Sequence, residues 1–234
     1  MLDCGVCSLK VIAVFNIYNE ASTIKEAIES AYWCDRIIVV DGAFKGFPTS
    51  DGKARSNDGT IEIVKELISQ YYDKLDIKLF TRNDYWGVQE KMQLYLKMLG
   101  DGDYFLRLNG DEIIESSSFN IHECLEEYVA ATGNLPLYQF YEYRPSPDSD
   151  KHYDWIPKMI KKTPTLKLTQ RHLALTNNFE PPYKMEGGRN RVVPTEANIP
   201  KDVIRIRHLT EQRSEQRKKQ NFQWLKVFHT LGIE

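Results

Sequence analysis

The sequence of 234 residues is poor in cysteine, with four such residues at Cys4, Cys7, Cys34 and Cys124. Cys4 and Cys7 form a C-x-x-C pair, but no second pair with the spacing of a zinc site follows. A chain of this length buries roughly 70% or a little more of its extended surface, so it needs no disulfide bonds to fold. We therefore expect four reduced thiols and a cytoplasmic protein.

Long apolar runs are also missing. No run of about 18 apolar residues occurs, and the N-terminus lacks a basic region followed by an apolar run and a small-residue cleavage site. We expect neither a membrane span nor a signal peptide. The net charge of -2 excludes a protein whose whole surface binds nucleic acid. With 41% hydrophobic and 27% charged residues, the composition is typical of one soluble globular domain, which we expect to span residues 1–234.

The first half of the chain alternates between two patterns. Short runs rich in β-branched residues predict four strands, at Lys10 to Phe15, Ile37 to Val40, Ile77 to Phe80 and Tyr104 to Leu108. The three segments between them have apolar residues at helical spacing. Thr23 and Glu26 have the spacing of a capping box, Asp58 can cap the second helix and Gly100 can end the third. This order predicts right-handed crossovers and an α/β fold with a largely parallel sheet.

Three of the four strands end in polar residues. These clusters are Asn16 to Glu20, Asp41 with Gly42, and Asn109 to Glu112. In parallel sheets ligands bind outside the carboxyl ends of the strands. Charges at the end of an apolar strand are costly to desolvate, so they usually need a partner such as a metal, a base or a ligand. The sequence therefore predicts a ligand site at this edge of the sheet.

The second half is less regular. Tyr138 to Arg144 and the alternating run Val203 to Arg207 suit strands, and Thr210 to Phe228 suits a helix. Two turn-rich polar loops lie between them, at Pro145 to Asp150 and Phe179 to Pro182. Since neither composition nor repeats mark a boundary, we take this half as part of the same domain.

Asp111, Glu112 and His208 are the candidate metal ligands. Mg²⁺ and Mn²⁺ prefer carboxylate oxygens and often bridge one or two carboxylates to a diphosphate. The alternative for the two acids is a solvated turn after a strand. His208 can add a neutral ring nitrogen, although a lone histidine is more often structural.

The C-terminal tail is basic. Six cations, Arg205, Arg207, Arg213, Arg217, Lys218 and Lys219, stand there against Glu211 and Glu215. A helix that begins near Thr210 would offer N–H groups and cations to a phosphate. The alternative is a solvated basic helix face. Asp41 can accept a hydrogen bond from a nucleobase N–H or a ribose hydroxyl, or can serve only the Asp-Gly turn.

Three segments in order, "FNIYNEASTIKEAIESAYWCDRIIVVDG", "SNDGTIEIVKELI" and "DYFLRLNGDE", resemble the family 2 glycosyltransferases with the GT-A fold. The resemblance covers roughly residues 10 to 115, with a weaker echo in "IRHLTEQRS". It implies a three-layer α/β/α sandwich, with a nucleotide-binding half (1–115) and an acceptor-binding half (116–234) that ends in the basic helix. It also implies a nucleotide-diphospho-sugar donor such as a UDP- or GDP-sugar, Mn²⁺ or Mg²⁺ as cofactor, and a glycan, lipid-linked or small-molecule acceptor.

The resemblance assigns roles to individual residues. Asp111 and His208 would bind the metal, and Asp41 the nucleobase. The remaining nucleotide contacts would come from Asn16, Tyr18, Asn19, Glu20, Asn109, Arg213, Arg217 and Lys218. Such enzymes usually invert the anomeric centre, using an acidic side chain as base. Our first candidate for that base is Glu186 in "KMEGGR", because two glycines beside it leave room; Asp154 and Glu112 follow.

The sequence departs from the family pattern at two places. Asn109 stands where the motif has its first carboxylate, which leaves open a relative that binds nucleotide or glycan without turnover. An insert at residues 43–55, "AFKGFPTSDGKAR", suggests a mobile loop over the site. A sugar nucleotidyltransferase is a weaker alternative, because "NIYNEAS" lacks the glycine-rich phosphate loop of those enzymes.

Overall fold

The computed structural model describes residues 9–49, 51–145, 153–164, 166–168, 175–177, 185–186, 189–190 and 196–230. Cys4, Cys7 and the loop Phe179 to Pro182 lie outside these ranges, as does most of the loop Pro145 to Asp150. Cys34 and Cys124 are free thiols. No helix in the described ranges is both long and apolar enough to cross a membrane.

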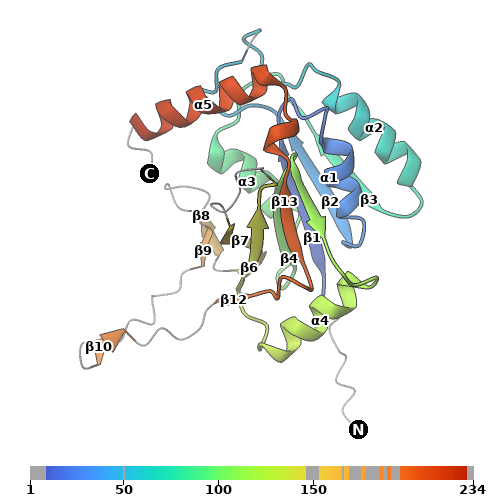
Figure 1. The fold of residues 1–234 in the computed structure, drawn as a ribbon, viewed down its shortest axis with the longest axis vertical. Coiled ribbons are helices and arrows are strands. Elements are labelled where there is room, and N and C mark those ends of the chain that lie inside the picture. The colour runs from blue at the N-terminus through green and yellow to red at the C-terminus, as the bar shows by residue number, and fades with distance from the viewer. Residues whose placement is uncertain are drawn as a thin grey trace.

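The first half forms the strand–helix alternation that the sequence predicts (Figure 1). Its elements are β1 (Val11–Ile17), α1 (Ile24–Ser30), β2 (Arg36–Asp41), α2 (Thr60–Tyr71), β3 (Asp76–Phe80), α3 (Val88–Leu96) and β4 (Tyr104–Asn109). β1 lies between β2 and β4, β3 lies beyond β2, and all these pairs are parallel. The carboxyl ends of β1, β2 and β4 therefore meet at one edge.

Helices cover both faces of this sheet. Ala13 and Phe15 of β1 pack in the cluster that contains residues of α1, α2 and α4 (Ile121–Ala131). Ile12 and Val14 pack in the second cluster, with residues of α3. Because successive side chains of a strand point to opposite faces, one strand supplies both cores. The expected three-layer α/β/α arrangement is confirmed.

The second half adds strands to the same sheet. The elements in it are β5 (Glu112–Glu115), β6 (Leu137–Tyr143), β7 (Tyr153–Lys161), β12 (Glu196–Asn198) and β13 (Arg205–His208). Two separate hairpins are β8 (Leu166–Leu168) with β9 (Leu175–Asn177), and β10 (Met185–Glu186) with β11 (Arg189–Asn190). The strand order is β3-β2-β1-β4-β7-β6-β13-β5, with β12 beside β6. Five of the eight pairs in this sheet are parallel, so the prediction of a mostly parallel sheet is confirmed.

The sheet curls, and this curl brings distant residues together. Only Gly110 and Asp111 separate β4 from β5 in the chain. In the sheet, however, β5 is the last strand of the order and pairs with β13, so three strands lie between β4 and β5. In that antiparallel pair His208 lies opposite Glu112. The turn after β4 therefore meets the end of β13.

A β-bulge interrupts the pairing of β6 with β7. Tyr138 pairs with Met159, but the next residue, Gln139, pairs with Pro157, so Lys158 has no partner in the ladder. An extra residue of this kind bends its strand and redirects a side chain. Lys158 is consequently buried, with 5% of its surface exposed, although it lies next to Met159 in the chain.

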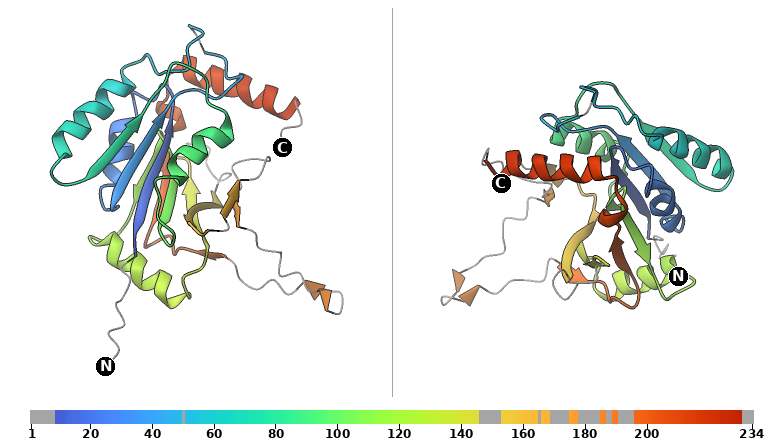
Figure 2. Two further views of the ribbon diagram at one scale, coloured as in Figure 1. Left: turned by 180° about the vertical axis from the view of Figure 1, so that it is seen from behind. Right: turned by 45° about the horizontal axis from the view of Figure 1, so that its top comes forward.

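Helix boundaries differ from the predictions in four places. The N-cap of α2 is Gly59 and not Asp58, whose side chain accepts a hydrogen bond from Thr60 N at 3.1 Å. Thr23 makes no capping hydrogen bond, so the expected capping box is wrong; its hydroxyl donates to the carbonyl of Gly110 at 2.7 Å instead. α3 ends at Leu96, before Gly100. The C-terminal segment begins with a 3-10 turn (η1, Thr210–Gln212), and the helix α5 (Glu215–Thr230) starts only after it. α5 runs across one end of the strands, and α4 lies at the other end (Figures 1 and 2).

The insert at residues 43–55 is held against the sheet. Ala43 N donates to Ala54 O at 2.7 Å, and Trp86 N donates to Ala43 O at 3.0 Å. Phe47 is buried and packs edge-on against Tyr18, with ring centroids 5.4 Å apart. Through Phe47, this segment forms part of a wall beside the loop that follows β1, and its mobility stays a prediction.

Candidate active site

Two loops meet at the carboxyl edge of the sheet. One follows β1 and the other, at Gly110, follows β4. A Cβ atom at Gly110 would lie 2.7 Å from Cγ of Glu20, closer than real Cβ contacts come. Only glycine allows this approach. Asn16 and Asn109 are partners in the parallel register of β1 and β4, so their side chains start side by side.

The two residues predicted to bind a metal lie side by side. Asp111 is fully buried, and its Oδ2 is 3.1 Å from Nδ1 of His208. The Thr210 hydroxyl lies 2.5 Å from the same nitrogen and 3.3 Å from Asp111 Oδ2. Leu209 N donates to the carbonyl of Asp111 at 2.7 Å, which fixes the turn after β13 against the turn after β4.

Two arginines from the C-terminal segment reach the same edge. Arg213 donates two hydrogen bonds to the Glu20 carboxylate, at 2.6 and 2.8 Å, and one to Asp111 at 2.7 Å. Arg217 contacts Glu20 at 3.2 Å and donates to the carbonyl of Tyr18 at 2.9 Å. Burial raises the pKa of Glu20, against the lowering effect of the two arginines. Because Arg213 precedes α5, it reaches this position from the extended residue after η1 and not from the first turn of the helix.

A second group of charges lies on the other side of the imidazole of His208. Glu112, Glu142 and His208 are all buried, and one ligand atom from each lies within 4.8 Å of the others. The Lys158 ammonium lies between the two carboxylates, 2.6 Å from Glu112 and 3.1 Å from Glu142. Asn109 Nδ2 donates to Glu112 at 2.5 Å.

These contacts decide the charge states of the group. Burial opposes ionisation of Glu112, yet the charge of Lys158 holds its pKa below the usual value. Burial likewise opposes the ammonium of Lys158, yet Glu112 and Glu142 keep its pKa above the usual value. A carboxylate–ammonium–carboxylate arrangement is therefore built into the core of the curl.

The donor atoms at this edge fit a hard divalent cation. Two neighbouring ligands of one Mg²⁺, each about 2.1 Å from the ion, stand about 3.0 Å apart. The separation of 3.1 Å between Asp111 and His208 is close to that spacing, and it is equally the length of a direct hydrogen bond between the two side chains. The three groups of Glu112, Glu142 and His208 are spread more widely, and Lys158 already supplies a positive charge to both carboxylates. The pair of Asp111 and His208 is therefore the better fit.

Two adjoining cavities open beside these residues. The smaller, of about 130 Å³, has walls formed by Asn16, Tyr18, Phe47 and Lys91. The larger, of about 420 Å³, is lined by His208 and Thr210 among others. Both are lined by Asn109, Arg213, Arg217 and Asn221. The arginines thus lie where the two cavities meet.

Asp41 lies behind the wall of the smaller cavity and lines neither cavity. Its carboxylate is fully buried and accepts hydrogen bonds from Ser56 N and Oγ and from the Thr81 hydroxyl. Burial raises the pKa of this carboxyl group, against the lowering effect of Ser56. In this arrangement Asp41 holds the loop after β2, and contact with a nucleobase stays a prediction.

The remaining predicted residues are placed less centrally. Asn19 is in the left-handed region at φ 51° and binds the backbone N–H of Asn57 through its side chain. Lys218 lines the larger cavity and contacts Glu215 at 2.9 Å. Asp154 is exposed and lies opposite Glu142 in the β6–β7 register.

Of the three base candidates, Glu186 lies in the β10–β11 hairpin, and its side chain is outside the described part of the structure. Glu112 is enclosed by Lys158 and Asn109. No contact in the described residues selects among Glu186, Asp154 and Glu112.

Sequence reasoning missed Glu142, Lys158 and Lys91. Tyr138, Phe140 and Glu142 are the alternate, buried positions of β6. A charged residue at the third of these positions could have indicated a buried charge in the sequence. Lys158 gave no signal, because its direction depends on the bulge. Lys91, on α3, is almost fully buried and donates to Gly42 O at 2.9 Å; burial lowers its pKa to about 7.

No protein-family model and no curated protein matches the sequence. Among solved structures, residues 1–349 of S. aureus TarS in complex with UDP-GlcNAc are similar, with 18% identity, 62% of this chain and 37% of that chain covered, and a TM-score of 0.43. GalNAc-T7 with UDP, GalNAc and Mn²⁺ has 13% identity, 87% and 44% coverage, and a TM-score of 0.45. A UDP-glucose pyrophosphorylase complexed with UDP-glucose has 11% identity, 66% and 69% coverage, and a TM-score of 0.34. This chain thus spans well under half of the TarS chain.

Proposed function

We propose that this chain is a glycosyltransferase that moves a sugar from a nucleotide-diphospho-sugar to an acceptor hydroxyl, with a divalent cation, Mn²⁺ or Mg²⁺, and with inversion. The observation that carries this proposal is the contact of the buried Asp111, which itself lines neither cavity, with His208 of the larger cavity and with Arg213, which lines both. The sequence resemblance assigns these same three residues to the metal and the diphosphate.

The cavities divide the donor into parts. In this proposal the nucleobase enters the smaller cavity, beside the Tyr18 and Phe47 rings. The diphosphate then lies at the junction, where Arg213 and Arg217 can donate charge-assisted hydrogen bonds to its oxygens. The sugar and the acceptor fall in the larger cavity.

The residues at the junction act on the leaving group. Arg213 and Arg217 are already ordered by Glu20, so they stabilise developing negative charge with little rearrangement. A cation held by Asp111 and His208 would supply further charge stabilisation to the departing diphosphate. The acceptor's proton goes to a carboxylate, for which Glu186, Asp154 and Glu112 are the candidates. A single displacement of this kind inverts the anomeric centre.

Binding measurements test this function. UDP and GDP, each with and without Mn²⁺, are titrated by calorimetry into the wild type and into Asp111→Asn. The matched control is Asp76→Asn, whose carboxylate pairs with Arg36 at the start of β3, at the opposite end of the strand from the site. We expect Mn²⁺ to strengthen diphosphate binding in the wild type and the control, and to lose most of that effect in Asp111→Asn. Equal Mn²⁺ dependence in all three proteins would refute the metal role of Asp111.

Turnover separates the enzyme from a binding relative. The engagement of Asn109 with Glu112 is the feature that favours a relative that binds without turnover, since this amide replaces a carboxylate of the motif. Hydrolysis of a donor with Mn²⁺ supports the transferase. Tight metal-dependent binding with no hydrolysis or transfer of any donor supports the binding protein. Glu186→Gln and Asp154→Asn, measured for turnover and for donor binding, then identify the base as the variant that loses only turnover.

A further inference from the structure

The larger cavity has positive charge and no acidic wall. Four of the residues that line it are the cations Arg144, Arg213, Arg217 and Lys218, and no Asp or Glu lines it among the described residues. Exposed cations on the wall of a cavity attract anions from solution. A cation that already has a carboxylate partner attracts a further anion less strongly than one that has none.

Three of the four cations have a carboxylate partner. Arg213 and Arg217 bind Glu20, and Lys218 contacts Glu215. Arg144 follows β6 directly and is exposed, and no carboxylate of the described part of the chain forms an ion pair with it. Its guanidinium therefore lines the cavity without a carboxylate partner from the described part of the chain.

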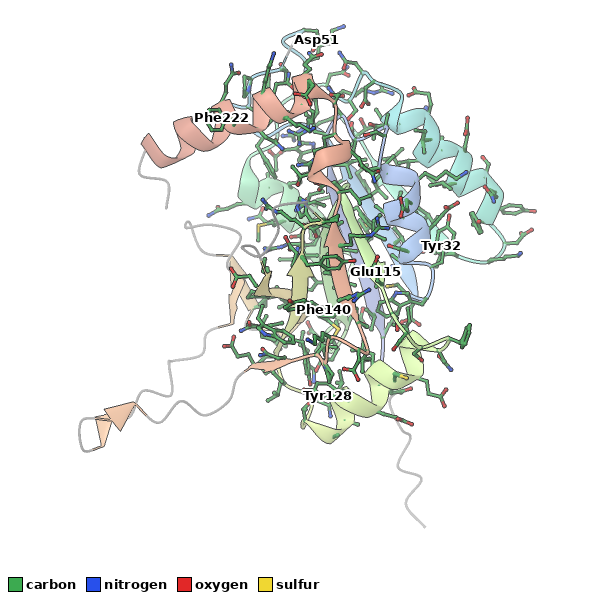
Figure 3. All side chains as sticks on the ribbon, in the orientation of Figure 1. Tyr32, Asp51, Glu115, Tyr128, Phe140 and Phe222 are labelled. Carbon is green, nitrogen blue, oxygen red and sulfur yellow. The ribbon has the colours of Figure 1, made fainter. Side chains whose placement is uncertain are left out.

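Arg144 lines only the larger cavity and has no part in the smaller one. Asn109, Arg213 and Arg217 line both cavities, whereas Arg144 and Phe222 line only the larger one. Phe222 stands on α5 and is 60% exposed (Figure 3). An exposed ring and a guanidinium that line one cavity offer it an apolar surface for the C–H face of a sugar and a donor for an anion.

On this basis we infer that the larger cavity binds a sugar that carries a carboxylate or phosphate group, held by bidentate hydrogen bonds from Arg144 while its ring packs on Phe222. The inference rests on the proposed function, since it names the substrate class of the same site. The diphosphate of the donor is served by Arg213 and Arg217, so the charge of Arg144 is left for a second anion. That anion is on the donor sugar or on the acceptor.

Two calorimetric arms distinguish these sources. In the first, UDP-glucuronic acid is compared with UDP-glucose in the presence of Mn²⁺. In the second, glucose 6-phosphate is compared with glucose in the absence of nucleotide. Each arm uses the wild type, Arg144→Met and the control Arg36→Met, whose guanidinium pairs with Asp76 away from both cavities.

We expect the anionic sugar to bind about tenfold to a hundredfold more tightly than its neutral counterpart in one arm, and Arg144→Met to abolish that preference. A preference in the first arm places the anion on the donor, and one in the second arm places it on the acceptor. If UDP binds with Mn²⁺ but neither arm shows a preference that depends on Arg144, this inference is wrong and the transferase remains. If neither UDP nor GDP binds with Mn²⁺ but glucose 6-phosphate binds through Arg144, the ligand class stands and the transferase is wrong.

Discussion

Replacing Lys158 by methionine tests the buried charge group directly. Lys158 is 5% exposed, and its ammonium lies 2.6 Å from Glu112 and 3.1 Å from Glu142, which are 1% and 7% exposed. Methionine keeps a flexible apolar side chain that is one atom shorter than that of lysine, and it removes the charged ammonium. The substitution therefore leaves two buried carboxylates without their main counter-charge.

The expected loss of stability is large. Removing one partner of a buried ion pair typically costs about 3–5 kcal/mol, because the remaining charge is buried without compensation. Lys162→Met is the matched control, since Lys162 pairs with Asp101 at the surface, where Asp101 is 57% exposed. Exposed pairs contribute about 0–1 kcal/mol. The same substitution is therefore expected to lower the free energy of unfolding much more at Lys158 than at Lys162.

The pH dependence gives a second and independent readout. In the wild type the pKa of Glu112 is below its usual 4.5, so its stabilising contribution is complete above pH 4.5 and constant from pH 5 to 7. Without Lys158, burial raises that pKa above 4.5, so the folded state binds a proton that the unfolded state has lost. The stability of Lys158→Met then falls as pH rises, by up to about 1.4 kcal/mol per pH unit.

Urea unfolding at pH 5 and pH 7 measures both effects. We expect the difference between wild type and Lys158→Met to be largest at pH 7 and the difference for Lys162→Met to be small at both. A loss below about 1 kcal/mol at pH 7, or a loss that does not grow from pH 5 to pH 7, would show that Glu112, Lys158 and Glu142 do not form a buried charge group.

Three further outcomes follow from the geometry. Gly110→Ala places a Cβ 2.7 Å from Cγ of Glu20, so we expect a loss of about 1–3 kcal/mol in urea unfolding and weaker UDP binding by calorimetry. The pKa of Lys91 is lowered from 10.5 to about 7 by burial, so wild-type stability should rise from pH 7 to pH 9, and Lys91→Met should remove that rise in thermal unfolding. Asn109→Asp turns a hydrogen bond to Glu112 into a like-charge contact, so we expect a loss of stability at pH 7 that Mn²⁺ reduces.

The sequence predicted what depends on local periodicity. β1 to β4 and the helices between them follow from apolar spacing over a few residues, and so does their parallel order. Asp111 and His208 were predicted together because both follow strands, and the structure places them 3.1 Å apart. The late start of α5 was not predictable, because Thr210 to Ser214 has a helical composition and is held extended at Arg213 by its contacts with Glu20 and Asp111.

The other residues of the site come together through the tertiary structure, which the pattern of a few neighbouring residues does not predict. Glu142 and Lys158 join the group only because the sheet curls until β5 reaches β13, and because a bulge turns one residue of β7 inward. Neither the curl nor the bulge changes the composition of its strand. The strand pattern in the sequence places the charged Glu142 at a buried position, but it does not identify Lys158 as its partner.

The amide at Asn109 is explained by the same charges. Glu20, Asp111, Glu112 and Glu142 are four buried carboxylates, and Lys158, Arg213 and Arg217 are the three cations that contact them. A carboxylate at position 109 would add a fifth negative charge 2.5 Å from Glu112, where the amide now donates a hydrogen bond. Lys158 already balances Glu112 and Glu142, so an amide at position 109 avoids a further buried negative charge that this one ammonium would have to compensate.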